Sequence, residues 1–286
     1  MTVTETAERM REIIRLTDER MALAPVEGAL GLVMDDLDSS SLRLGGSVPL
    51  NDGRPDPVAM TALICVLTDT AAGLASALGR PYGDGGATVE LRIDHLAPVH
   101  PDVRRLHADA RQIHVGSGVA LAEATLCDDR GAVLARAHGH FAHIPGNWSF
   151  PPEDSPHVPG KPLFGPAELG AALTLDPATD PLERTVALPE VLANPRRQIH
   201  GGVVVALAEL AQRQVREAAT SPGAAPPRLL SISVDYLRPA DCDGSTVICR
   251  SEYTRHGKRF STLRTELVRP DGRVAAIATG LWSAVD

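Results

Sequence analysis

Two long stretches of apolar residues stand out in the hydropathy pattern of the chain. From Thr61 to Leu78 nearly every position is apolar or small, and a second stretch, from Gly202 to Ala219, is apolar for most of its first half. A helix that is apolar on all sides is buried, so the first stretch predicts a core helix. Shorter segments follow each stretch, and some of them partly alternate between apolar and polar residues, as residues 264–269 do. The pattern predicts one long helix followed by three or four strands in each half.

The two halves form an internal repeat. Residues 91–98 align with residues 232–239, and the same offset also places Gly131 on Gly272 in two predicted turns. A slightly shorter offset superposes the two long helices, with Asp69 on Glu209. One insertion or deletion between helix and strand reconciles the two offsets. Spacing this constant over about 75 residues predicts two copies of one domain.

The residues between the halves, and those before the first half, differ in composition from the repeat. Residues 144–181 contain nine prolines, which exclude a sheet or a long helix and predict a linker. The first 24 residues mix acidic and basic residues with apolar ones, so they predict an amphipathic helix rather than a signal peptide. We therefore expect an N-terminal helix at 1–24, a first domain at 25–144, a linker at 145–181 and a second domain at 182–286.

Composition narrows the kinds of partner and compartment. The formal net charge is −8 and only 3% of the 286 residues are aromatic, so neither a broad basic surface nor a set of stacking side chains for nucleic acid is expected. The chain has no run of about 18 apolar residues, so we expect no membrane span. Four cysteines without a CxxC pair predict reduced thiols in a cytoplasmic protein.

One long helix against a strongly curved antiparallel sheet, present twice, resembles the hotdog fold. Hotdog domains pair so that their sheets become continuous and their helices meet near the interface. The resemblance therefore implies an α+β double hotdog, in which the two halves of one chain make this pair. It leaves open whether two such chains associate further as a homodimer.

The second long helix begins with His200, Gly201 and Gly202. The first N–H groups of a helix have no intrahelical partner, and the helix dipole adds partial positive charge there. Two glycines remove the Cβ atoms that would hold a substrate carbonyl away from these groups. This geometry suits an oxyanion that forms during acyl transfer, for which one preorganised donor is worth roughly 3–4 kcal/mol.

The residues around this helix start resemble the PaaI-like branch of the hotdog acyl-CoA thioesterases. The matching positions are Asn194, His200, Gly201, Gly202 and Glu209. The resemblance covers about residues 185–284 and implies hydrolysis of a small-molecule acyl-CoA thioester. It gives Gly201 the N–H that polarises the thioester carbonyl, His200 a positioning role, and Asn194 the orientation of the attacking water or of the carboxylate. Coenzyme A enters as part of the substrate, and neither another cofactor nor a metal is expected.

The first long helix carries a carboxylate, Asp69, among apolar residues. A buried charge needs a partner or a task, because leaving it unpaired is expensive. With Thr70 and Gly73 after it, Asp69 also resembles the catalytic acid on the equivalent helix of the same family, and these small residues leave room for an acyl chain. A structural ion pair is the alternative. Where the second helix has its His-Gly pair, the first has Met60 and Thr61, so a glycine-lined oxyanion site is missing there.

In paired hotdog thioesterases of this kind, each site combines the glycine of one domain with the acid of the other. Applied to this chain, the resemblance pairs Gly201 with Asp69, and Thr61 with Glu209. The first combination has every part and the second lacks the glycine, so we expect one working site and one degenerate site. Arg213, four residues after Glu209, is the expected partner of that carboxylate. Whether Asp69 attacks the thioester directly or activates a water is left open.

Several further residues are candidates for binding. Those expected to bind the substrate are Thr70, Gly73, Gly202, Arg255, Lys258 and Arg259. The last three belong to a basic hairpin that either grips the phosphates of coenzyme A or is simply solvated. His138, His140 and His143 raise metal binding as an alternative, although no nearby acidic residue or cysteine completes a convincing ligand set.

Two other functions within the same fold stay open. The chain is a non-catalytic acyl-CoA-binding or regulatory protein if its one complete site has also decayed. It is an enoyl-thioester hydratase or dehydratase if the carboxylate works with a histidine instead. That chemistry usually pairs the two residues on one stretch, and neither long helix carries a histidine within its body. The sequence specifies neither the acyl chain nor whether coenzyme A or a carrier protein bears it.

Overall fold

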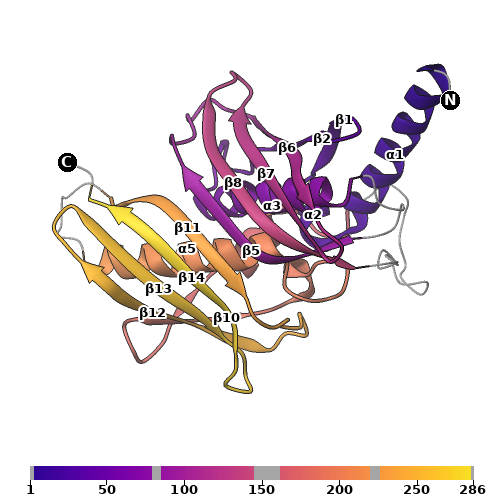
Figure 1. Cartoon of the computed structure of the whole chain (residues 1–286). Coiled ribbons are helices and arrows are strands. Elements are labelled where there is room, and N and C mark those ends of the chain that lie inside the picture. The colour runs from indigo at the N-terminus through magenta and orange to yellow at the C-terminus, as the bar shows by residue number, and fades with distance from the viewer. Residues whose placement is uncertain (1–2, 79–84, 145–161, 220–225, 285–286) are drawn as a thin grey trace.

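A computed structural model of the chain describes residues 3–78, 85–144, 162–219 and 226–284. Its first half contains α1 (Val3–Leu23), α2 (Pro25–Ala29), β1 (Val33–Leu37), β2 (Ser41–Ser47), β3 (Leu50–Asn51), β4 (Arg54–Pro55), α3 (Pro57–Ser76), β5 (Gly85–His95), β6 (Arg105–Val115), β7 (Val119–Asp128) and β8 (Val133–Ile144). Its second half contains α4 (Pro166–Ala172), β9 (Asp176–Pro177), β10 (Glu183–Ala187), the 3-10 helix η1 (Glu190–Leu192), α5 (Gly201–Ala218), β11 (Arg228–Tyr236), β12 (Thr246–His256), β13 (Phe260–Val268) and β14 (Val274–Ser283). Each half thus has one long helix, α3 or α5, followed by strands, as the repeat predicts (Figure 1).

The helix α3 begins four residues before the predicted start at Thr61. The Asp56 carboxylate caps it by accepting hydrogen bonds from the backbone N–H groups of Val58 and Ala59, at 2.9 and 3.0 Å. Pro57 occupies the first helical position, where a missing N–H removes no helix hydrogen bond. By length and composition α3 is apolar enough to cross a membrane, but 72% of that apolar window is buried inside this fold. Here α3 is the core helix of the first half.

The long strands of both halves form one antiparallel sheet. Among the described residues it has twelve strands, in the order β1-β2-β6-β7-β8-β5-β11-β14-β13-β12-β10-β9. The halves join where β5 pairs with β11, with Ile93 opposite Ile232. Each half of the sheet curves around its own helix, and α3 and α5 pack against each other where the halves meet (Figure 1). This α+β arrangement is the predicted double hotdog.

Two glycines mark equivalent turns of the repeat. Gly131 lies between β7 and β8 with a φ of 81°, and Gly272 lies between β13 and β14 with a φ of 77°. Glycine adopts this left-handed backbone without steric cost, which is why it stands at both positions. Both predicted turns are confirmed.

The predicted linker contains a helix and a short strand in its second half, residues 162–181. Residues 145–161 lie outside the described residues. After them come α4, which is seven residues long, and β9, which pairs with β10 at the edge of the sheet. The expectation that prolines exclude a strand from this segment is therefore wrong at Asp176–Pro177. An edge strand tolerates proline, because the side without a partner needs no N–H donor.

The N-terminal segment adds two helices to the hotdog pair. Met21, near the end of α1, is buried in the core. A Cβ atom on Gly28 of α2 would lie 2.4 Å from the carbonyl oxygen of Ala22, so the absence of a side chain there allows α1 and α2 to meet closely. The helix α2 packs against η1 of the second half. Through this contact the N-terminal segment reaches the junction between the halves.

Candidate active site

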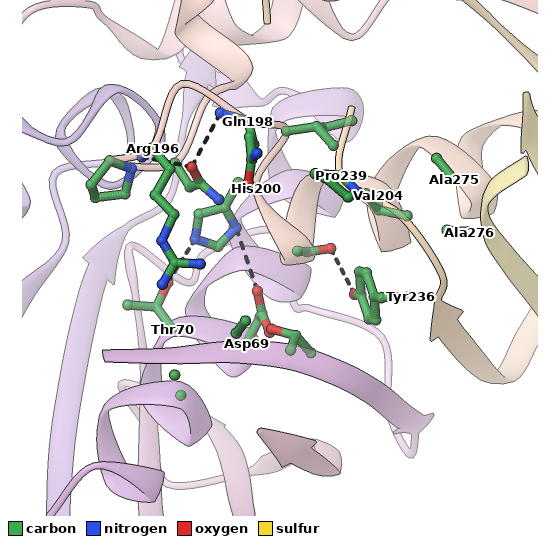
Figure 2. Close-up of a pocket in the computed structure, with 18 of the residues that line it drawn as sticks. Asp69, Thr70, Arg196, Gln198, His200, Val204, Tyr236, Pro239, Ala275 and Ala276 are labelled. Atoms are coloured by element: carbon green, nitrogen blue, oxygen red, sulfur yellow. Dashed lines mark hydrogen bonds and ion pairs between the residues drawn. The ribbon is translucent and has the colours of Figure 1, made fainter. Parts of the chain in front are cut away.

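A cavity of about 410 Å³ lies at the junction between the two halves. Its walls come from α3, from the start of α5 and the loop before it, and from the end of β11 (Figure 2). The predicted site residues that line it are Asp69, Thr70, Gly73, Asn194, His200 and Gly201. Residues from both halves of the chain therefore meet at one cavity.

The start of α5 presents backbone N–H groups to this cavity. His200 is the N-cap of the helix, and its Nδ1 accepts a hydrogen bond of 3.0 Å from the N–H of Gly202. Across the described part of the chain, no protein acceptor engages the N–H of Gly201. The first N–H groups of a helix lack intrahelical partners, so this one is available to a substrate oxygen.

Both glycines at this helix start are required by close packing. A Cβ atom on Gly201 would lie 2.5 Å from Asp69 Oδ2 and 3.0 Å from Thr88 Oγ1. A Cβ atom on Gly202 would lie 2.5 Å from the Cα of Val66, in the backbone of α3. Gly201 thus leaves space beside the carboxylate, whereas Gly202 lets the two helices touch.

Asp69 is a buried carboxylate at the wall of the cavity. Its side chain belongs to a residue that is only 4% exposed. Thr88 Oγ1 donates a hydrogen bond of 2.9 Å to Oδ1, and Oδ2 lies 3.5 Å from Nδ1 of His200. Burial raises the pKa of Asp69 above its ordinary value, against the opposing effects of His200, Thr88 and the N–H of Gly202. The carboxyl group is therefore a stronger base than an exposed aspartate.

His200 lies between two carboxylates. Its Nε2 is 3.3 Å from Oε1 of Glu27, a buried residue of α2, and 3.4 Å from Oγ1 of Thr70. Burial by itself lowers the pKa of His200, but the charges of Glu27 and Asp69 outweigh it, so that the pKa is raised above its ordinary value. The imidazole is therefore protonated more readily than a histidine that is only 6% exposed and has no carboxylate beside it.

Asn194 organises the loop before α5. Its Oδ1 accepts hydrogen bonds from the backbone N–H groups of Arg196, at 2.8 Å, and of Gln198, at 3.2 Å. The adjacent Arg197 has a φ of 61°, in the left-handed region. The predicted role of Asn194, orienting the attacking water or the carboxylate, stays a prediction, and it would require the amide NH₂ group because the loop engages the oxygen.

Three residues that contact Asp69, His200 or Gly201 were not predicted from the sequence: Glu27, Thr88 and Tyr236. The Tyr236 hydroxyl donates a hydrogen bond of 2.8 Å to the carbonyl oxygen of Gly201, and burial raises its pKa well above the ordinary value. The repeat could have indicated Tyr236, because this residue aligns with His95. Tyr236 contacts Gly201 at the start of α5, and His95 lies near Glu209 within α5. Glu27 and Thr88 carry no comparable signal in the sequence.

The basic hairpin residues Arg255, Lys258 and Arg259 are not among those that line the cavity. They lie at the turn between β12 and β13, and the neighbouring Phe260 pairs with Ser283 at the end of β14. The cavity is lined by Ala276 at the start of β14, seven residues away, which is about 23 Å along a strand. Of the predicted substrate-binding residues, these three are therefore distant from the cavity, whereas Gly202 lies at the helix start beside it but packs against α3 and does not line it. The cations that line the cavity are Arg196 and Arg238.

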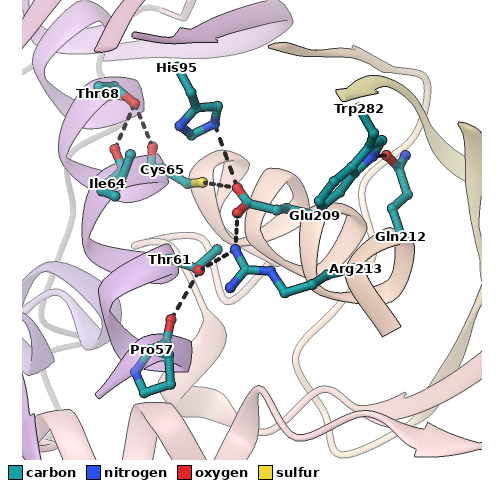
Figure 3. A network of polar contacts seen from close by, with 10 residues as sticks. All are labelled: Pro57, Thr61, Ile64, Cys65, Thr68, His95, Glu209, Gln212, Arg213 and Trp282. Atoms are coloured by element: carbon teal, nitrogen blue, oxygen red, sulfur yellow. Dashed lines mark hydrogen bonds and ion pairs between the residues drawn. The ribbon is translucent and has the colours of Figure 1, made fainter. Parts of the chain in front are cut away.

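The predicted degenerate site, which combines Thr61 with Glu209, is surrounded by other side chains than the site at Asp69 (Figure 3). Arg213 forms an ion pair with Glu209 and also donates a hydrogen bond of 3.4 Å to Oγ1 of Thr61. Nε2 of His95 is 3.7 Å from Glu209 Oε2, and Sγ of Cys65 is 4.0 Å from the same oxygen. Glu209 is thus neutralised inside the protein and is not among the residues that line the cavity. Met60, at the position equivalent to His200, is buried and offers no polar group.

Gln212 fills the space that small residues leave open in the first half. It stands on α5 where α3 has Ala72, and its Oε1 accepts a hydrogen bond of 2.8 Å from Nε1 of Trp282. Its Nε2 donates to Oγ1 of Thr265 at 3.0 Å. The side chain is fully buried, so it closes this part of the second half.

Two histidine groups bear on metal binding. His140 Nδ1 lies 2.9 Å from Glu90 Oε2, at hydrogen-bond distance, on the exposed face of the sheet. Over the described residues, one group of three side chains could offer ligand atoms to a metal together, and it consists of His107, Asp109 and Cys127. Arg43 already holds the carboxylate of Asp109 through two nitrogens, at 2.6 and 3.1 Å. This positive charge makes the group a poor cation site.

Two family models match the chain, one in each half. Residues 58–135 match the family described as the thioesterase superfamily, and residues 189–283 match the acyl-CoA thioesterase N-terminal domain. The chain is also 35% identical over 101 residues to a Halobacterium salinarum protein whose assigned name is that of an esterase. That similarity covers 33% of this chain and 64% of the relative, so the chain spans just under two thirds of the length of the relative.

Solved structures with the same architecture are more distant in sequence. A TesB protein of Mycobacterium avium subspecies paratuberculosis superposes with a TM-score of 0.61 at 12% identity, over 91% of this chain and 98% of that chain. An Alicyclobacillus acidocaldarius protein described as having a hot dog fold gives a TM-score of 0.50 at 16% identity, over 95% and 98% of the two chains. At this level of identity the likeness establishes the fold alone.

Proposed function

Because both halves of the chain belong to the thioesterase superfamily of hotdog proteins, we propose that the chain hydrolyses acyl thioesters at one composite site between the halves. The observation that carries this proposal is the cavity shared by Asp69 of α3 and Gly201 of α5. A carboxylate supplies the base or nucleophile, and a free N–H at a helix start supplies the oxyanion donor. Glu209 is instead paired with Arg213, and the equivalent start of α3 carries Met60 and Thr61 in place of His200 and Gly201.

In the proposed reaction the thioester carbonyl oxygen accepts a hydrogen bond from the N–H of Gly201. Ionised Asp69 then either attacks the carbonyl carbon or removes a proton from an attacking water. The tetrahedral intermediate collapses by breaking the C–S bond, and a thiolate leaves without strong acid assistance because thiol pKa values lie near 8–9. Direct attack leaves a mixed anhydride between Asp69 and the acyl group, which a water then hydrolyses. After a single turnover in ¹⁸O-labelled water, label in the Asp69 carboxyl group identifies direct attack, because general-base catalysis places the label in the product acid alone.

The substrate that we propose is an acyl-CoA. Arg196 and Arg238 line the cavity and offer guanidinium donors of the kind that bind phosphate groups. The coenzyme would be part of the substrate and no separate cofactor would be required. Comparing an acyl-CoA with the same acyl group on a carrier protein tests this assignment, and turnover confined to the carrier protein would reject it.

The test of the proposed activity is a thiol-release assay across a panel of acyl-CoA thioesters of different chain length. The wild type is expected to release thiol, and Gly201→Ala and Asp69→Asn are expected to release far less. A wild-type protein that hydrolyses no thioester but binds acyl-CoA would support the non-catalytic alternative.

Hydration of an enoyl thioester is the second candidate function. The pairing of Asp69 with His200, at 3.5 Å across the two halves, is the observation that favours it. An enoyl-CoA assay followed at the absorbance of the conjugated double bond distinguishes the two reactions, because hydration removes the double bond without releasing thiol.

A further inference from the structure

Glu27 is a buried carboxylate with a single histidine as its partner. It belongs to α2, ahead of the first hotdog sheet, and it is 4% exposed. Its Oε1 lies 3.3 Å from Nε2 of His200, and its Oε2 has no hydrogen-bond partner among the described residues. A buried, half-satisfied carboxylate costs stability, so such a group points to a functional role rather than a structural one.

The repeat supplies an internal comparison for Glu27. Glu168 of α4 is its counterpart, since the offset between these two glutamates is the same as the one that relates Gly131 to Gly272. Glu168 is exposed and caps its own helix, because its Oε2 accepts a hydrogen bond of 2.7 Å from the N–H of Gly165. The equivalent N–H in α2, that of Ala24, already donates to carbonyl oxygens of α1. Glu27 is therefore not needed as a cap, and its side chain turns to His200 instead.

The hydrogen bonds around His200 define which ring nitrogen carries the proton. Nδ1 accepts a hydrogen bond from the N–H of Gly202 and therefore carries a lone pair, so in the neutral imidazole the proton resides on Nε2. Nε2 faces the Glu27 carboxylate and the Thr70 hydroxyl. Nδ1 in turn lies 3.5 Å from Oδ2 of Asp69.

We propose that Glu27 is a positioning residue that holds His200 in its Nε2–H tautomer, with Nδ1 directed at Asp69. The effect on turnover rests on the proposed thioesterase function, whereas the tautomer does not. Asp69 takes the proton of the attacking water and gives it to the departing thiolate, so the O–H bond formed on Asp69 breaks as the S–H bond forms. The lone pair of Nδ1 stays engaged by the N–H of Gly202, and Glu27 acts by holding the ring of His200 in this orientation beside Asp69.

The equivalent pair of positions in the repeat agrees with this assignment. At the start of α3 Met60 replaces the histidine, and Glu168 of the second half, the counterpart of Glu27, is exposed and caps α4. The carboxylate is thus turned inward only where a histidine is present to receive it. The other charged and titratable groups that line the same cavity as His200 are Glu27, Asp69, Arg196, Tyr236 and Arg238, and of these Glu27 and Asp69 lie 3.3 and 3.5 Å from its ring nitrogens.

The test compares Glu27→Gln with the matched variant Glu168→Gln. Two-dimensional NMR of ¹⁵N-labelled histidine reports the tautomer and the titration of His200. We expect the Nε2–H tautomer in the wild type and in Glu168→Gln, and a lower pKa of His200 in Glu27→Gln. We also expect kcat to fall about 10- to 100-fold in Glu27→Gln with KM nearly unchanged, as when a hydrogen bond to a charged group is lost.

An Nδ1–H tautomer in the wild type, or an unchanged titration of His200 in Glu27→Gln, would overturn the proposal. Because these signals need no substrate, they decide the matter even if the wild type hydrolyses no thioester. If Glu27→Gln does not fold, Glu27→Asp keeps the charge and withdraws it by one methylene group. A smaller reduction of the same pKa is then expected, and no reduction would reject the role of Glu27.

Discussion

A methyl group added at Gly201 should remove activity, while one added at its neighbour Gly202 should remove stability. The new Cβ at position 201 would lie 2.5 Å from Asp69 Oδ2 and 3.0 Å from Thr88 Oγ1, which are the ends of side chains that can turn aside. The fold can absorb this change, but the carboxylate is displaced and the N–H is shielded from a substrate oxygen. Losing one oxyanion donor costs roughly 3–4 kcal/mol, or about 10²- to 10³-fold in kcat.

At position 202 the new Cβ would meet backbone atoms of α3 instead. It would lie 2.5 Å from the Cα of Val66 and 2.7 Å from the carbonyl oxygen of Cys65, so two core helices must separate. Overpacking of this kind costs about 1–3 kcal/mol or more. Thermal unfolding and thiol release measured on both variants test the contrast, with Gly170→Ala, whose Cβ meets only ordinary contacts at 3.8 Å, as the control. The reasoning is refuted if Gly201→Ala turns over normally or if Gly202→Ala melts with the wild type.

Three further predictions concern the same region. Burial raises the folded-state pKa of Asp69 above 3.8, so the stability that its protonation contributes is present below that pH and is lost as the pH rises through the folded-state pKa. The melting temperature of Asp69→Asn, relative to that of the wild type, should therefore increase as the pH rises. A difference in melting temperature that is constant with pH would contradict this. Gln212→Leu leaves the buried Nε1 of Trp282 without an acceptor and should lower the free energy of unfolding by about 1–3 kcal/mol. Chemical unfolding followed by tryptophan fluorescence measures this, and an unchanged denaturation midpoint would show that the bond is dispensable. Tyr236→Phe removes the hydrogen bond to the carbonyl oxygen of Gly201 and should lower kcat by about 2- to 10-fold without unfolding the protein; a wild-type kcat would argue that Tyr236 only fills space.

The sequence was sufficient for the fold because the repeat and the apolar helices are strong signals. An all-apolar stretch such as Thr61–Leu78 has to be buried, and the constant offset between the matching segments requires two copies of one domain. The start of α3 was missed by four residues because a cap, here Asp56 with Pro57, is a local polar feature outside the apolar pattern. The strand β9 was missed because two residues at a sheet edge carry almost no pattern.

The site could be predicted only where a single segment carries the signal. Asp69, His200 and Gly201 each lie in a recognisable local motif, and the paired domains bring them together. Glu27 and Thr88 reach the cavity through contacts between segments far apart in the chain, which spacing within a segment cannot show. The prediction that the basic residues around Arg255 lie at the substrate site is not met for a related reason. A hairpin pattern in the sequence does not tell at which end of the sheet the turn lies.

The central claim is that the two halves provide one working site, at Asp69, and not two. The most direct measurement compares kcat/KM for thioester hydrolysis in Asp69→Asn and Glu209→Gln, which remove equivalent buried carboxylates of the repeat. We predict a loss of about 10²- to 10⁴-fold for Asp69→Asn, the usual range for a catalytic base, and a value near that of the wild type for Glu209→Gln. Equal losses in the two variants would contradict the claim.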